Sequence, residues 1–247
     1  MPALRLNIMN PLEFRRGVIK PIECYKEAWE LIKNHFWLLL AVIFVGGFIG
    51  AASMYVLLGA MTCGAFYCYL KVIDRRDFKF EDLFKGFGFW LPGLIVTLFI
   101  IIPMLILYGI IYIPPLVVIA ANPNIKPEEL LLVFGISFAV DTVFTIFMVC
   151  LHTLLMFSFP LIVDRNLSAF QAMKTSARAV WANLGGVAGL FGIGFILCFA
   201  GMAAFCLGIY FVIPLMMGAN TLAYRKIFPA SENQNFNPPP PNYYQGI

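Results

Sequence analysis

Charge is scarce in this chain. Of its 247 residues only 12% are Asp, Glu, Lys or Arg, whereas 61% are hydrophobic, and the mean hydropathy is +0.86. A soluble domain needs a far more polar surface, so the composition excludes an ordinary soluble protein and predicts a surface that faces lipid. We therefore expect an all-α polytopic membrane protein in the cell membrane, or in the inner membrane if the source is bacterial.

Residue types that build catalytic and metal centres are also few. The chain has two histidines, and its six cysteines form no CxxC pair. HExxH, GxSxG, GxGxxG and P-loop patterns are absent as well. We therefore expect no metal site, no cofactor and no enzyme activity. Nucleic-acid binding is not expected either, because the cations flank apolar blocks and form no continuous basic patch.

Long uncharged blocks alternate with short cationic segments, and sixteen of the seventeen Lys and Arg residues lie in four such segments. A bilayer core of about 30 Å needs roughly 20 apolar residues per helix. The blocks predict about six spans, near 36–54, 56–73, 89–121, 130–163, 183–200 and 205–224. The third contains prolines and is expected to be one kinked helix.

The positions of the cations predict the orientation. Cytoplasmic loops carry an excess of Lys and Arg, and only Lys126 lies in a segment that the six spans place outside. Both termini are therefore predicted to be cytoplasmic.

Three amphipathic helices are predicted on the cytoplasmic side, near 20–35, 79–87 and 168–182, as parts of a six-helix membrane domain over 20–228. Ser168 and Gln171 are expected to form a capping box at the start of the third. Such helices either bind anionic lipid in the headgroup layer or dock on the ends of the bundle. The candidate surface for lipid or a partner protein consists of four residues: Trp29, Lys33, Lys174 and Arg178.

Asp141 is the only carboxylate inside a predicted span. An intramembrane charge is a functional candidate because its burial is costly. Thr145 and His152 project on nearly the same helix face, although His152 lies about 16 Å from Asp141 along the axis. These residues either line a polar track or, in the alternative, Asp141 lies near the interface and is satisfied by water or a neighbouring helix.

The ends of the chain differ from the membrane domain. Residues 1–19 form a polar cytoplasmic segment, and residues 229–247 are rich in Asn and Pro and predict a disordered tail. The tail includes a PPxY pattern at 240–243, the type of motif that WW domains bind. A weak internal repeat pairs the segment after Lys26 with the segment after Lys174, each an amphipathic helix followed by a hairpin.

Several stretches across residues 20–228 resemble a broad group of bacterial membrane proteins related to the membrane domain found with some glycerophosphodiester phosphodiesterases. They are Gly59–Gly64, Asp82–Phe87, Phe159–Arg165, Ala172–Ser176, Pro214 and Ala223–Lys226. The resemblance implies a six-helix module with interfacial helices. No catalytic residue carries over, because the chain has no phosphodiesterase domain. Asp164 and Arg165 are expected to form an ion pair or to cap the following helix.

These observations support three hypotheses of function. The first is a non-enzymatic module that organises membrane lipids, or an unidentified partner protein, at the cytoplasmic face. The second is a transporter or lipid-translocating protein that uses a polar track around Asp141. The third is an integral-membrane enzyme, for which the residue spacing shows no convergent polar cluster.

Overall fold

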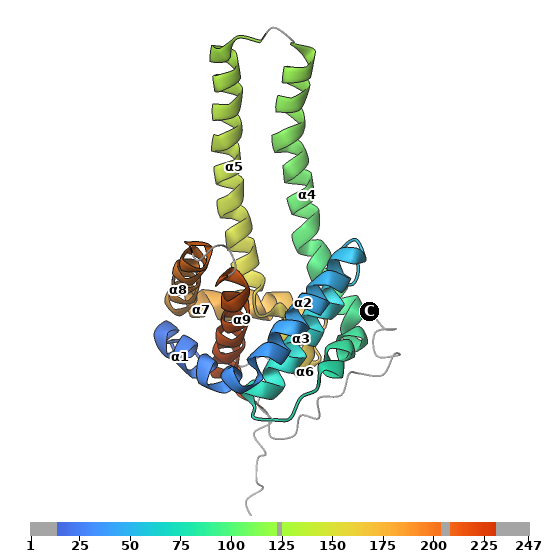
Figure 1. Cartoon of the computed structure of the whole chain (residues 1–247), viewed down its shortest axis with the longest axis vertical. Coiled ribbons are helices and arrows are strands. Elements are labelled where there is room, and N and C mark those ends of the chain that lie inside the picture. Colours follow the sequence, from blue (N-terminus) through green and yellow to red (C-terminus); the bar gives the residue numbers. More distant parts are fainter. Residues whose placement is uncertain (1–13, 123–124, 204–207, 231–247) are drawn as a thin grey trace, which may run out of the picture.

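The computed structural model describes residues 14–122, 125–203 and 208–230, and within these ranges every regular element is helical. A long hairpin of α4 (Trp90–Ala121) and α5 (Pro127–Leu155) rises from a base formed by the other helices (Figure 1). α4 continues through its three interior prolines, Pro103, Pro114 and Pro115, as one helix. Most of the predicted disordered tail, including the PPxY pattern, lies outside the described residues.

Each predicted span contains a helix. The base holds α2 (Phe36–Ala52), α3 (Leu58–Ile73), α8 (Leu184–Ala203) and α9 (Gly208–Ile227).

Four helical stretches of the described chain are long and apolar enough to cross a membrane, namely 21–52, 80–121, 127–165 and 184–203, whereas α3 is shorter. The protein is thus helical and has the helix lengths and composition of a membrane protein. The number of crossings stays a prediction.

The fourth predicted span, 130–163, differs from the prediction because it is broken. α5 ends at Leu155, and α6 (Ser158–Arg165) begins after a two-residue turn. The hydroxyl of Ser176, on α7 (Ala169–Ala182), donates to the carbonyl oxygen of Leu154 at 2.7 Å and accepts from the amide of Phe157 at 3.1 Å. A helix end leaves backbone groups without partners, and the hydroxyl of Ser176 provides a partner for two of them. A residue of the base therefore stabilises the end of α5.

The helix α1 (Pro21–Ile32) buries only part of the apolar stripe that its sequence predicts, which consists of Ile22, Tyr25, Trp29, Ile32 and Phe36. Tyr25, Ile32 and Phe36 are buried, whereas Ile22 and Trp29 are 63% and 44% exposed and Cys24 and Ala28 are buried instead. α1 packs against α9 and α8, and the hydroxyl of Tyr25 donates to the carbonyl oxygen of Leu190 at 3.1 Å. Tertiary packing therefore rotates the buried face relative to the predicted stripe.

The other two predicted amphipathic helices also differ in detail. Ser168 is the N-cap of α7 but makes no side-chain capping bond, so the predicted capping box does not form. Phe170, expected on the apolar face of α7, is 64% exposed. The segment 79–87 forms a 3₁₀ helix, η2 (Phe80–Phe89).

Glycines allow η2 and α4 to approach the backbone of α3. A Cβ atom on Gly64 would lie 1.8 Å from the carbonyl oxygen of Leu83, and one on Gly59 would lie 2.2 Å from that of Gly93. No other residue permits such contacts. The stretch Gly59–Gly64, which sequence analysis singled out, is therefore where α3 contacts both η2 and α4.

The two halves of the predicted repeat are packed differently. α1 lies mainly on α8 and α9, whereas α7 lies mainly on α4, α5 and α6. The GxxxG glycines of α8 differ too: a Cβ on Gly189 would meet Pro21, but Gly185 has no neighbour within 4 Å. The two halves thus have different neighbours in the structure, which adds no support to the repeat. The repeat stays a prediction from sequence.

Candidate functional site

Polar side chains gather at three places among the described residues of the base. At one of them Asp82 pairs with Lys71 at 2.8 Å and with Lys85 at 2.7 Å, so its charge is compensated.

Of the other two, the first is a buried ion-pair cluster. It joins the ends of α3, α6 and α9 through Arg225, whose guanidinium bonds both carboxylate oxygens of Asp74 at 2.8 and 2.7 Å and lies 2.7 Å from Asp164. Asp164 also accepts from the hydroxyl of Tyr224 at 2.7 Å and pairs with Arg165 at 3.2 Å. The ion pair between Asp164 and Arg165, one of the two predicted alternatives, is thus present.

The charges of this cluster balance one another. Burial alone would lower the pKa of Arg225, but hydrogen bonds to the carboxylates of Asp74 and Asp164 outweigh it and raise that pKa above its usual range. A buried pair of this kind holds helices in register but leaves little charge for a ligand. We therefore assign the cluster a structural role.

The second place is a cationic groove where the base meets the α4–α5 hairpin. It has a volume of about 760 Å³ and is lined by the N-terminal segment, the inner end of α5 and the exposed face of α7. Its lining residues are Phe14, Arg16, Leu154, Ala177, Arg178, Trp181 and Ala182.

Asn183 brings the N-terminal segment to this groove. Its side-chain oxygen accepts from the amide of Gly17 at 2.7 Å, and its side-chain nitrogen donates to the carbonyl oxygens of Arg15 at 3.1 Å and Ala179 at 2.9 Å. Asn183 is 4% exposed. One buried amide thus fixes the backbone on both sides of Arg16 and ties it to the helix that carries Arg178.

The cations of the groove have no carboxylate partner in the part of the chain that the structure describes. Among the described residues, neither Arg16 nor Arg178 has a carboxylate within ion-pair distance, and the same holds for Lys174 one turn before Arg178. Trp181 is 73% exposed. The groove therefore combines two accessible guanidinium groups, an interfacial aromatic ring and an apolar wall.

The surface of α1 is different, although it contributes two predicted site residues. Lys33 pairs with Glu30, Lys20 with Glu23 and Lys226 with Glu27. Trp29 packs its ring edge against Phe36, with the ring centroids 5.8 Å apart. The cations of this helix are largely compensated, so Trp29 and Lys33 do not join Lys174 and Arg178 in one cationic surface.

The residues of the predicted polar track lie on α5, apart from the three polar sites. Asp141 is half-buried and has no hydrogen-bond or ion-pair partner among the described residues, whereas Thr145 and His152 are exposed. Two cavities between α4 and α5 are lined by apolar side chains together with Ser137. In the part of the chain that the structure describes, no other helix therefore contributes a hydrogen-bond or ion-pair partner to Asp141.

No family model, curated protein or solved structure matches this chain. The resemblance to the phosphodiesterase-associated membrane domain thus stays a prediction from the residues that suggested it.

Sequence reasoning identified Arg178 and Lys174 but missed Phe14, Arg16 and Trp181. Residues 14 and 16 lie more than 160 positions before Arg178 in the sequence, and no local pattern indicates that contact. The sequence offers one sign of this contact, Asn183. An amide side chain at the start of an apolar helix requires hydrogen-bond partners when it is buried.

Proposed function

We propose that this protein is a non-enzymatic membrane module that binds anionic phospholipid through the cationic groove at its cytoplasmic face. The observation that carries the proposal is a pair of exposed guanidinium groups, those of Arg16 and Arg178, which line one groove with Trp181 and have no carboxylate partner among the described residues. In this proposal, the base and both termini face the cytoplasm. The absence of a catalytic motif from the sequence supports the non-enzymatic role.

The distribution of charge supports this orientation. α4 and α5 contain no Lys or Arg, and the tip of their hairpin carries Lys126 together with Glu128 and Glu129. The other described cations belong to the base or to its connecting segments. The positive-inside rule therefore favours the base as the cytoplasmic side.

The chemistry of the groove favours a phosphate headgroup attached to an acyl chain. Guanidinium groups bind phosphate oxygens through paired N–H donors, and tryptophan is enriched at the membrane interface. The apolar wall includes Leu154, at the inner end of the exposed hairpin. A phospholipid in this position places its phosphate at Arg16 and Arg178 and its chains along α5.

The proposal is tested by lipid binding to the purified full-length chain. A double variant, Arg16→Gln with Arg178→Gln, removes two charges from the groove, and Lys26→Gln with Arg75→Gln removes two exposed charges elsewhere on the base as a matched control. Bound phosphatidylglycerol and phosphatidylcholine are then counted by native mass spectrometry during titration in mixed micelles.

The groove variant is expected to bind phosphatidylglycerol on the order of tenfold more weakly, because each basic residue near an anionic surface contributes about 1 kcal/mol. The control is expected to change by less than about twofold, as for exposed charges in general. Equal binding by the groove variant and the unchanged protein would contradict the proposal.

The transporter or lipid-translocation hypothesis keeps Asp141 as its main support. The apolar lining of the two α4–α5 cavities offers no continuation of a polar track, so we favour lipid binding. An unidentified partner protein stays a prediction from sequence.

A further inference from the structure

A cavity lies between the helices of the long hairpin, on the tip side of the cationic groove. It has a volume of about 630 Å³, and the described residues that line it are all apolar: Leu107, Ala139, Val140, Val143, Phe144 and Phe147. Phe144 is 7% exposed, and its ring meets the ring of Tyr108 on α4 edge-on, with the centroids 5.9 Å apart. This aromatic contact closes the cavity between the helices. Val143 and Phe147 are 69% and 51% exposed, so the other side is open to lipid.

The cavity and the cationic groove lie along the same face of α5. Leu154, the α5 residue that lines the groove, follows Phe147 by seven residues and Val143 by eleven. Helix residues at these spacings project from the same side. Cys150 and Leu151, which lie between them near this face, carry no charge. An uncharged wall therefore leads from the groove to the cavity.

The length of the hairpin places the groove at the depth of the lipid headgroups. From Leu130 to Leu154, α5 is about 36 Å long at 1.5 Å per residue, and a hydrocarbon core is about 30 Å thick. When the tip of the hairpin lies at the outer surface, Leu154 therefore lies about 6 Å beyond the inner boundary of the core. Phe147, Val143 and Val140 lie about 11, 17 and 21 Å from Leu154 toward the tip, in the inner half of the core.

A phospholipid of the inner leaflet has its parts at these two levels. Its phosphate lies in the headgroup layer, and its acyl chains fill half of the core, about 15 Å. The groove offers the guanidinium groups of Arg16 and Arg178 at the first level, and the cavity lies at the second. The separation of the two sites is therefore the one that a single lipid requires.

We propose that the cavity between α4 and α5 is an acyl-chain site, which holds one chain of the anionic phospholipid whose phosphate lies at Arg16 and Arg178. The inference rests on the proposed lipid binding and narrows its ligand to phospholipids with chains of ordinary membrane length. A lipid with short chains reaches the groove but not the cavity. In an apolar solvent, only shape and van der Waals contact select a chain, and a cavity lined by side chains provides both.

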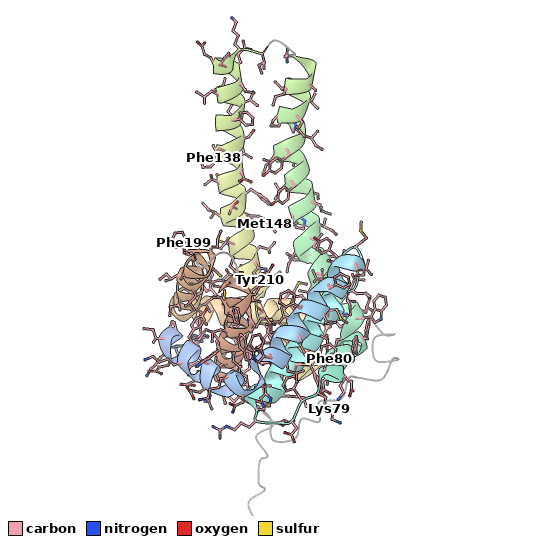
Figure 2. All side chains as sticks on the ribbon, viewed as in Figure 1. Lys79, Phe80, Phe138, Met148, Phe199 and Tyr210 are labelled. Carbon is pink, nitrogen blue, oxygen red and sulfur yellow. The ribbon has the colours of Figure 1, made fainter. Side chains whose placement is uncertain are left out.

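Two valines of α5 provide a matched pair of variants. Val143→Trp places a large ring in the cavity, whereas Val149→Trp adds the same ring to the other side of the helix. Val149 is 56% exposed and lies eleven residues after Phe138, which is 75% exposed and projects away from the hairpin (Figure 2). Both valines are exposed, so neither substitution disturbs a buried contact.

Binding of phosphatidylglycerol to the purified full-length chain is measured by native mass spectrometry in mixed micelles. Two forms of the lipid are compared, one with dioleoyl chains and one with dihexanoyl chains. The shorter chains reach about 5 Å into the core, whereas Val143 lies about 11 Å inside its inner boundary. Only the dioleoyl lipid can therefore contact the ring at position 143.

Val143→Trp is expected to bind the dioleoyl lipid roughly five- to tenfold more weakly, because the ring takes the place of the chain and removes its contacts. Its binding of the dihexanoyl lipid is expected to change by less than about twofold, as is the binding of both lipids by Val149→Trp. Equal binding of the dioleoyl lipid by the two variants would overturn the acyl-chain site. Equal weakening of both lipids by Val143→Trp would also overturn it, since the ring would then act on the groove.

The groove variant, Arg16→Gln with Arg178→Gln, separates this inference from the proposed function. If it weakens the binding of both lipids and Val143→Trp weakens neither, lipid binding at the groove stands and the acyl-chain site fails. If the groove variant weakens neither lipid, the proposed function fails, and the acyl-chain site fails with it.

Discussion

The base and the α4–α5 hairpin have a similar apolar character but are held together in different ways. In the base, helices approach through glycines, buried ion pairs join α3, α6 and α9, and Tyr69 and Tyr224 are fully buried. In the part of the hairpin that extends away from the base, the side chains mostly face outward, and among the described helices α4 and α5 there have only each other as neighbours (Figure 1). Apolar composition alone therefore does not indicate whether a helix is packed against protein or against lipid.

The largest expected effect comes from removing the charge at the centre of the base. Arg225→Leu leaves Asp74 and Asp164 buried without their shared partner, so it should destabilise the protein by about 3–5 kcal/mol. Lys226→Ala is the control, because the neighbouring Lys226 makes a more exposed pair with Glu27 and should cost less than about 1 kcal/mol. Thermal unfolding in detergent measures both, and similar losses would show that the cluster does not hold the base together.

A single type of substitution compares packing in the two regions directly. Gly64→Ala, in the base, places a methyl group against the carbonyl oxygen of Leu83, whereas Gly135 in α5 has no neighbour within 4 Å. The first change should destabilise by about 1–3 kcal/mol. Gly135→Ala should be neutral or stabilising by up to about 1 kcal/mol, through helix propensity. The midpoints of thermal unfolding give both values, and equal losses would remove the distinction between the regions.

The smallest effect is expected at the charge within the hairpin. Asp141 has no partner among the described residues, so Asp141→Asn should change the free energy of unfolding by less than about 0.5 kcal/mol. Ion and lipid transport by the reconstituted protein provides a second measurement. Loss of a transport activity with unchanged stability would favour the polar-track hypothesis over lipid binding.

Much of the secondary structure followed from the sequence. The six predicted spans each contain a helix, since uncharged blocks of this length have few alternatives to helix in a membrane. The break at the end of α5 was missed because its backbone groups are satisfied by Ser176, which lies 19 residues or more from the groups it bonds. The buried face of α1 was predicted only in part for a similar reason: Tyr25 and Ile32 are buried as expected, but the contact with α8 and α9 buries Cys24 and Ala28 in place of Ile22 and Trp29.

The sequence predicted only part of the candidate site. Lys174 and Arg178 stand out because they lie on the polar face of a predicted amphipathic helix, and both residues are exposed in the structure. Arg16 gives no such signal, because its place depends on the bonds of Asn183 to Arg15 and Gly17. A contact across that distance in the chain is decided by packing and not by local pattern.

The sequence by itself determined that the chain is helical and apolar, and it determined which segments carry charge, because these properties follow from composition and spacing alone. Only the tertiary structure decided how far each hairpin extends and which cations are neutralised. The reason is physical: two hairpins of different length both return their ends to the same side of the membrane. The contact between Gly59 and Gly93 sets the level of one hairpin against the other, and no local pattern predicts it.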